Sequence, residues 1–208
     1  MFIVFEGIDG SGKSTQIQRF VQYLFSLDKN IHIILTRNPY KDTHARSIIK
    51  EENDVTSRAE KLADIFIKDR ELHSQELIIP NIEKGIYVIC DRFSFSTVAY
   101  QGAQGIDIHS LLQKQKNIPI PDLTFLIDVL PEEAIKRIIL DNKRIEKPHK
   151  FEQSVDFMQK IRNNYLTIKQ LCPNQNILVI DGNQDIANIH KEIITHFEKF
   201  YYSEQKVN

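Results

Sequence analysis

The chain has 208 residues, and its 27 lysines and arginines against 28 aspartates and glutamates give a formal net charge of -1. This near balance argues against a protein that coats nucleic acid, so we expect no nucleic-acid partner and only local basic sites. The length suits a single domain with a full hydrophobic core, and we expect that domain to span residues 1–208.

The two cysteines, Cys90 and Cys172, are too few for a disulfide framework, and both are expected to be reduced packing residues. The N-terminus begins with an apolar run instead of a basic segment, and no apolar stretch approaches the roughly 18 residues of a membrane helix. We therefore expect neither export nor membrane insertion, and a cytoplasmic location.

Five short apolar runs, taken in chain order, predict the strands of a sheet. They are FIVF (2–5), IHIIL (31–35), YVIC (87–90), LTFLIDV (123–129) and ILVID (177–181). Because each run is almost continuously apolar, the strands should be buried on both faces, as in a parallel sheet.

Segments with helical periodicity alternate with these runs. The first begins at Lys13, and its apolar residues recur at the i, i+3, i+4, i+7 spacing of one helical stripe. The others lie at 57–79, near 106–115, at 151–171 and at 185–200. Alternating strands and helices predict an α/β fold whose ligands bind beyond the carboxyl ends of the strands. The polar tail, 201–208, is expected to fray.

The first turn after an apolar run has the spacing of a phosphate-binding loop. Gly7, Gly12, Lys13 and Ser14 satisfy G-x-x-x-x-G-K-[ST] between a predicted strand and a predicted helix. Lys13 would reach the β- and γ-phosphates of a nucleoside triphosphate, and Ser14 would ligate Mg²⁺. The loop alone fits a kinase, a GTPase switch or an ATP-driven motor. The residues expected to bind ATP here are Gly7, Asp9, Gly10, Ser11, Gly12, Lys13, Ser14 and Thr15.

A second motif, DRFSFSTVAYQG (91–102), follows the third apolar run. Asp91, at the end of a predicted strand, is suited to the Mg²⁺ shell, directly or through water. Arg92 has a planar guanidinium suited to a second phosphate. A lone Asp-Arg pair is usually an ordinary ion pair, so the interpretation depends on the residues around it.

The whole stretch resembles the DRY-x-x-S-x-x-A-Y-Q-G signature of the thymidylate kinase family, with Phe93 in place of the usual tyrosine. The loop FEGIDGSGKSTQ and the segments LADIFIKDRELH (62–73) and IPDLTFLIDVLPEEAIKR (120–137) resemble the same family in the same order. The resemblance implies a three-layer α/β/α P-loop kinase fold with a five-stranded parallel sheet and a short lid. It also implies a homodimeric dTMP kinase that uses ATP and Mg²⁺ and produces dTDP.

The resemblance further implies how the acceptor is bound. Phe66 would stack on thymine and Arg70 would bond the base edge, and the i, i+4 spacing places both on one helix face. Core packing is the alternative for Phe66. Arg37, in TRNP, and Arg92 match the two arginines that hold the acceptor's 5′-phosphate.

Several other positions match family residues around the two nucleotides. Tyr100 and Gln101 would line the deoxyribose and the base, and Ser96 is expected to approach the base as well. Asp9 matches the acidic residue that bonds the 3′-hydroxyl, and Arg137 matches a position near adenine. The residues expected to act in catalysis are Lys13, Asp9, Arg92 and Arg144.

The catalytic cation Arg144 is expected in a lid. Some family members carry an arginine inside the phosphate loop, at the position where this chain has Gly10, so the cation must come from elsewhere. The basic segment DNKRIEKPHKFE (141–152) contains Pro148, a helix breaker, and suits a lid that closes over phosphates. Arg144 is favoured, a solvated charge run is the alternative, and the rival cations are Lys143, Lys147 and Lys150.

One segment departs from the family pattern. Many relatives read T-R-E-P-G-G-T where this chain reads TRNPYKDT (36–43), so Asn38 replaces a glutamate and Tyr40 stands among residues that replace the glycines. Arg37 and Pro39 remain, which favours continued phosphate binding by a loop of a different shape.

Two other functions compete with a dTMP kinase. One is a related kinase for dUMP, a dTMP analogue or a nucleoside, although Arg37 and Arg92 favour an acceptor that already bears a phosphate. The other is a nucleotide-dependent switch. The N-K-x-D base-reading motif of GTPases does not occur in the sequence, which argues against that form of switch.

Overall fold

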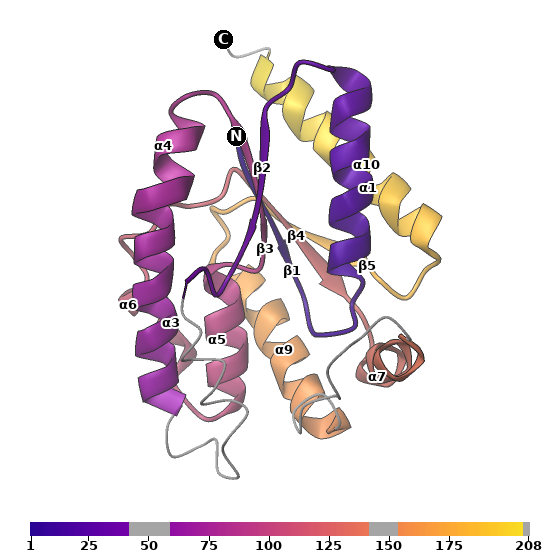
Figure 1. Ribbon diagram of the computed structural model, residues 1–208. Helices are drawn as coiled ribbons and strands as arrows, with labels where there is room; N and C mark the ends of the chain where they lie inside the picture. Colours follow the sequence, from indigo (N-terminus) through magenta and orange to yellow (C-terminus); the bar gives the residue numbers. More distant parts are fainter. Residues whose placement is uncertain (42–58, 142–153, 206–208) are drawn as a thin grey trace.

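A computed structural model describes residues 1–41, 59–141 and 154–205. At its centre is a five-stranded parallel sheet with the strand order β2-β3-β1-β4-β5 (Figure 1). Each strand contains most of one apolar run, so the predicted strand positions are confirmed. Burial on both faces is wrong for β2, which lies at the edge of the sheet and has Leu35 54% exposed. The strands are β1 (Phe2–Glu6), β2 (Ile33–Arg37), β3 (Tyr87–Asp91), β4 (Leu123–Asp128) and β5 (Ile177–Asp181).

Helices lie on both sides of the sheet, which confirms the predicted α/β class. On one face lie α1 (Lys13–Leu27) and α10 (Ile186–Gln205), and on the other lie α3 (Ala59–His73), α5 (Ser94–Ala103) and α9 (Val155–Leu171) (Figure 1). The shorter elements are the π-helical turn η1 (Ser74–Ile78), α4 (Ile79–Ile82), α6 (Ile108–Lys114) and α7 (Pro131–Leu140). The periodicity did not predict α5 or α7. Within the described ranges, no helix is long and apolar enough to cross a bilayer.

The strand register brings the carboxyl ends of β1, β2 and β3 to one edge of the sheet. Asp91, the last residue of β3, lies opposite Phe5 of β1 and opposite Arg37 of β2. The alignment continues past the strands, because the N–H of Arg92 donates to the Phe5 carbonyl at 2.9 Å and that of Asn38 donates to the Asp91 carbonyl at 3.2 Å. The phosphate loop, the TRNP segment and the DRF motif therefore meet at this edge, where parallel α/β sheets bind ligands.

Four buried phenylalanines hold α1 and α10 against the sheet. The ring centroid of Phe20, on α1, lies 5.7 Å from that of Phe5, 5.9 Å from that of Phe125 and 5.0 Å from that of Phe197. Most of these contacts are edge-to-face, the arrangement that the quadrupoles of aromatic rings favour. Phe20 therefore links β1, β4 and α10 and fixes the helix that follows the phosphate loop.

The prediction that the tail frays is wrong for residues 201–205. α10 continues to Gln205, and the ring of Tyr201 stacks on Phe197 with the centroids 5.6 Å apart. This apolar contact keeps the last turns of the helix on the core, despite the polar character of the segment. Residues 206–208 lie outside the described residues.

Replacement of Phe20 by alanine should destabilise the fold strongly. Phe20 is fully buried, and removal of a buried phenylalanine costs about 3–5 kcal/mol in the free energy of unfolding. The matched control is Phe25→Ala on the same helix, where the ring is 43% exposed and the loss should stay below about 1 kcal/mol. Equilibrium urea denaturation followed by circular dichroism measures both, and equal losses would contradict the role given to Phe20.

Candidate active site

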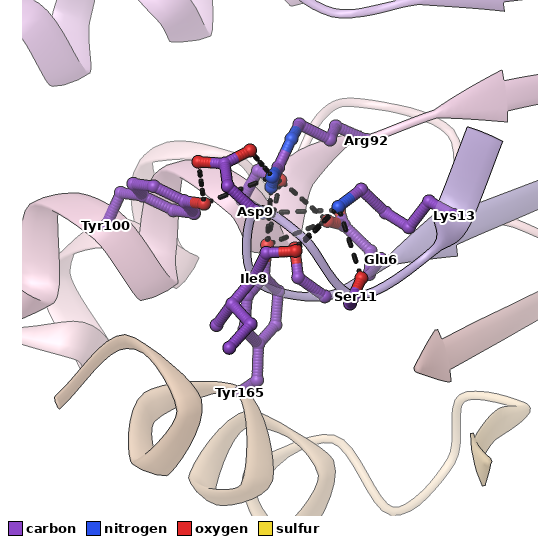
Figure 2. A network of polar contacts seen from close by, with 10 residues as sticks. Glu6, Ile8, Asp9, Ser11, Lys13, Arg92, Tyr100 and Tyr165 are labelled. Atoms are coloured by element: carbon purple, nitrogen blue, oxygen red, sulfur yellow. Dashed lines mark hydrogen bonds and ion pairs between the residues drawn. The ribbon is translucent and has the colours of Figure 1, made fainter. Parts of the chain in front are cut away.

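The phosphate loop joins β1 to α1 and folds around the amino group of Lys13. The Lys13 Nζ donates to the carbonyl of Gly7 at 3.0 Å, to that of Ile8 at 2.9 Å and to Ser11 Oγ at 3.4 Å (Figure 2). Burial lowers the pKa of Lys13 to about 8, and Arg92 acts in the same direction. The N-terminus of α1 adds its dipole at this point. The loop and first turn contain all eight predicted residues: Gly7, Asp9, Gly10, Ser11, Gly12, Lys13, Ser14 and Thr15.

Gly10 packs against the backbone of α7 and leaves no room for a side chain. Its φ is +79°, and a Cβ built there would lie 2.4 Å from the carbonyl oxygen of Ala134 and 3.0 Å from Cγ1 of Ile138. The loop arginine of some family members therefore does not fit here without movement of α7. The lack of room for an arginine at position 10 favours a catalytic cation from outside the phosphate loop. The favoured Arg144 and most of the predicted lid, residues 142–152, lie outside the described residues.

Asp9 of the phosphate loop and Arg92 of the DRF motif form an ion pair across the site. Arg92 Nη2 donates to Asp9 Oδ1 at 2.6 Å, and the Tyr100 hydroxyl donates to Asp9 Oδ2 at 2.7 Å (Figure 2). Burial acts to raise the pKa of Asp9, but the charges of Arg92 and Lys13 hold it far below its usual value. Asp9 is therefore ionised at neutral pH, and it joins the two motifs electrostatically.

Beneath Arg92 lies the buried carboxylate of Glu6, the last residue of β1. Its Oε1 accepts the backbone N–H groups of Phe93 at 2.8 Å and Ser96 at 3.2 Å, at the start of α5. Its Oε2 accepts the hydroxyls of Ser96 at 2.6 Å and Tyr165 at 3.0 Å. The carboxylate thus caps α5 and reaches α9, so both its oxygens are satisfied although none of Glu6 is exposed.

Arg92 rests on the hydroxyl groups that surround Glu6. Its Nη1 donates to Ser96 Oγ at 3.1 Å and to the Tyr165 hydroxyl at 3.2 Å, while Nη2 also donates to the Tyr100 hydroxyl at 3.0 Å. The backbone of Arg92 has φ of 70°, a conformation uncommon outside glycine. Such a conformation persists only where its surroundings fix it. The Ser96 hydroxyl donates to Glu6 in this structure. Its predicted contact with a base stays a prediction.

Arg70 forms a second buried cationic position, between α3 and α5. Its Nη2 donates to Thr97 Oγ1 at 2.9 Å, its Nη1 donates to Gln115 Oε1, and its guanidinium lies 5.5 Å from the ring centroid of Phe93. Burial lowers the pKa of Arg70 to about 10, so it stays charged at neutral pH. Within the described residues its Nε has no hydrogen-bond partner, so one donor remains for a ligand.

Two more predicted pocket residues lie on the same helices. Phe66 is half-buried one turn before Arg70 on α3. Gln101 is buried on α5, and its Oε1 accepts no hydrogen bond from the described part of the chain. An orphaned acceptor on Gln101 and an orphaned donor on Arg70 give this region both kinds of group that a nucleobase edge requires.

Two other predicted site residues, Arg37 and Arg137, do not belong to the hydrogen-bond network around Asp9. Arg37 ends β2 with an exposed side chain, and no hydrogen bond or ion pair holds that side chain within the ranges described. Arg137, on α7, pairs with Glu133 at 2.9 Å and takes no part in the network around Asp9. Their predicted contacts with phosphate and adenine stay predictions.

Four residues of this site were not predicted from the sequence. The role of Glu6 could have been predicted, because a carboxylate at the end of a strand that is buried on both faces needs buried hydrogen-bond donors. Nothing in the sequence indicated the roles of Tyr165, Thr97 and Gln115, since an aromatic residue in a helical stripe usually packs in the core and a lone threonine or glutamine usually faces solvent.

The residues at the predicted Mg²⁺ site fit the ion. Asp91 Oδ1 is buried and accepts no hydrogen bond from the described residues, and Ser14 is exposed in the first turn of α1. No cluster of three or more histidines, cysteines or carboxylates that suits a metal occurs in those residues. A single carboxylate and a hydroxyl suit Mg²⁺, which takes its other ligands from water and substrate phosphates.

Replacement of Gly10 by alanine should disturb the phosphate loop more than backbone strain alone requires. Gly85→Ala is the matched control, because its φ is +75° but its Cβ would meet nothing within 4 Å. We expect a loss of about 1 kcal/mol in the free energy of unfolding for the control and about 3 kcal/mol for Gly10→Ala, where overpacking is added. Urea denaturation of both variants tests this, and equal losses would show that the loop and α7 move apart freely.

Several known proteins are similar to this chain in sequence or in structure. A family model described as thymidylate kinase matches residues 5–193. A thymidylate kinase of Thermosipho africanus is 37% identical over 211 residues, which cover 98% of this chain and 100% of the relative. One from Carboxydothermus hydrogenoformans is 37% identical over 200 residues, covering 92% and 94%. A crystal structure of thymidylate kinase from Ehrlichia chaffeensis matches with a TM-score of 0.72 and 31% identity, over 95% of this chain and 98% of that one. The motifs, the fold and the relatives agree: the chain belongs to the thymidylate kinase family.

Proposed function

We propose that this protein transfers the γ-phosphate of ATP to the 5′-phosphate of dTMP, giving dTDP and ADP for dTTP synthesis. The observation that carries the proposal is the ion pair at 2.6 Å between Asp9 of the phosphate loop and Arg92 of the DRF motif. It joins a donor site to an acceptor site that contains the buried Arg70. Family membership supports the same reaction, and also a single-domain, homodimeric, cytoplasmic enzyme.

The transfer needs no protein nucleophile. An oxygen of the dTMP phosphate attacks the γ-phosphorus of ATP, the bond from that phosphorus to the β,γ-bridging oxygen breaks, and ADP leaves. Both reactants are anionic, so the protein's contribution is alignment and neutralisation of charge. Lys13 would exchange its loop carbonyls for the β- and γ-phosphates, and Arg92 would bond the acceptor phosphate. A basic lid residue, Arg144 in our assignment, would add a third cation.

Mg²⁺ held by Ser14 and, directly or through water, by Asp91 would neutralise part of the charge on the β- and γ-phosphates. The remaining roles belong to side chains that bind and orient dTMP. Phe66 would stack on thymine while the free Nε–H of Arg70 and the free Oε1 of Gln101 meet its edge. Asp9 would accept from the 3′-hydroxyl, and Arg37 would share the 5′-phosphate with Arg92.

A coupled assay of ADP release from Mg-ATP tests the function directly. It is run without acceptor and then with dTMP, dUMP, UMP, dGMP and thymidine in turn. We expect strong stimulation by dTMP, with dTDP as the product, and weak turnover without an acceptor because a kinase closes only around both substrates. ADP release at one rate whatever the acceptor would instead identify a nucleotide switch. Stimulation by thymidine alone would identify a nucleoside kinase.

Replacement of Arg70 by alanine should damage the acceptor site alone. Loss of a charged hydrogen-bond donor that faces the base should raise the KM for dTMP by about 100-fold and change the KM for ATP by less than about threefold. Steady-state kinetics with each substrate varied in turn measures the split. Arg19→Ala, an exposed position on α1, is the control. An equal rise in both KM values would remove Arg70 from base recognition.

ATP binding should take up a proton in alkaline solution. The pKa of Lys13 in the free protein is lowered to about 8 by burial, so as pH rises above this value the ammonium becomes neutral. ATP binds the charged form, and therefore its affinity should fall with rising pH while binding takes up an increasing fraction of a proton. Calorimetry at about pH 7 and about pH 9, in two buffers of different ionisation enthalpy, measures the uptake. Equal proton uptake at the two pH values would contradict the lowered pKa of Lys13.

A further inference from the structure

A second face of α3, beside the Phe66 and Arg70 face, holds the loop that follows β2. Asp69 accepts the backbone N–H of Tyr40 at 2.5 Å and that of Lys41 at 2.8 Å. Asp69 is buried, and bonds from backbone N–H groups to a buried carboxylate are among the stronger hydrogen bonds in proteins. The loop therefore has its backbone fixed by the helix that carries the predicted base-reading residues.

His73, one turn after Asp69, completes this contact. It is fully buried, and its Nδ1 accepts from the amide of Asn38 at 3.2 Å while Nε2 donates to Thr36 Oγ1 at 2.8 Å. The ring of Tyr40 stacks on the imidazole with the centroids 4.4 Å apart and the planes 14° apart. Burial lowers the pKa of His73 to about 4, so the ring is neutral near pH 7 and Nδ1 remains an acceptor. We call Asp69 and His73 with the loop residues that they hold the α3 clasp.

The clasp uses the residues that set this chain apart from the family pattern. Asn38 stands where many relatives have glutamate, and its amide donates to Nδ1 of a neutral histidine, which a carboxylate does not do. Tyr40 stands where relatives have glycine, and its ring supplies the stacking contact. A glycine at position 40 has no ring to stack on His73, so this contact is one that a T-R-E-P-G-G-T loop lacks.

The segment held by the clasp follows directly after Arg37. Arg92, the other arginine proposed for the acceptor phosphate, is fixed through its own side chain by Asp9, Ser96, Tyr100 and Tyr165. The Arg37 side chain has no such partner within the described residues. Its placement therefore depends on its backbone, which β3 holds as far as Asn38 and which the clasp holds through the side chains of Thr36 and Asn38 and the backbone that follows.

We propose that Asp69 and His73 are positioning residues that set Arg37 for the 5′-phosphate of the acceptor nucleotide. The inference rests on the proposed function. One helix, α3, then serves two parts of one ligand: Phe66 and Arg70 face the base, and Asp69 and His73 hold the loop that binds the phosphate. Damage to the clasp should weaken the binding of a nucleoside monophosphate and leave the binding of the matching nucleoside unchanged.

The first test is Asp69→Asn, which places an amide N–H₂ against one of the two backbone N–H groups. We expect the dissociation constant of dTMP to rise about tenfold, since a hydrogen bond to a charged group is lost, and that of thymidine to change by less than twofold. Calorimetry with both ligands measures the split. Asp64→Asn is the matched control, because Asp64 lies on the same helix in an exposed ion pair with Lys114. This control should bind both ligands as the unaltered protein does.

A double-mutant cycle with Arg37→Ala tests the route of the effect. If the clasp acts through Arg37, Asp69→Asn should change dTMP affinity by less than about twofold in the Arg37→Ala background. Tyr40→Ala, which removes the stacked ring from a partly exposed loop, provides a second variant should Asp69→Asn fold poorly. It should show the same split between dTMP and thymidine.

Two results would overturn the inference. One is an equal loss of dTMP and thymidine affinity, which would make the clasp a structural support for α3 as a whole. The other is full additivity with Arg37→Ala, which would show an effect independent of that arginine. Failure of the proposed function is distinct, because the unaltered protein would then show no stimulation of ADP release by dTMP.

Discussion

The buried carboxylate of Glu6 is the contact on which the active-site end of the sheet depends. It ends β1, caps the first turn of α5 and accepts a hydroxyl from α9, so three elements far apart in sequence share one acceptor. A buried charge is tolerated only when its hydrogen bonds are satisfied, and here the donors include the backbone on either side of the turn into α5. The position of Arg92, and through it that of Asp9, follows from this arrangement.

The three cations of the site are compensated in different ways. Arg92 has a carboxylate partner in Asp9, and Lys13 has loop carbonyls. Arg70 is bonded to the neutral oxygens of Thr97 and Gln115. Neutral partners orient a guanidinium without cancelling its charge. Lys13 and Arg70, whose partners are neutral, therefore keep more of their charge available for a ligand than Arg92, which is paired with Asp9.

The sequence predicted the parts of the molecule that depend on local spacing. The phosphate loop, the five strands and the DRF motif follow from periodicity and from residues that lie close together along the chain. Tyr165 and Gln115 did not follow, because each acts only after α9 or the segment behind α6 has packed against α5. The clasp is intermediate: Asn38 and Tyr40 were visible as departures, but their partner His73 is set by the pairing of β2 with β3 and the packing of α3.

The two arginines proposed for the acceptor phosphate differ in how their side chains are held, and this would have a consequence for the order of events in binding. An exposed guanidinium such as that of Arg37 keeps its hydration, and its field, although screened by water and salt, would attract a dianion before contact. Arg92 is held by four side chains, so in the proposed reaction it would receive the phosphate in one orientation. In the proposed reaction, diffusional capture and final alignment would thus be separate tasks of two residues at the ends of neighbouring strands, where Arg37 is paired with Asp91, the residue before Arg92.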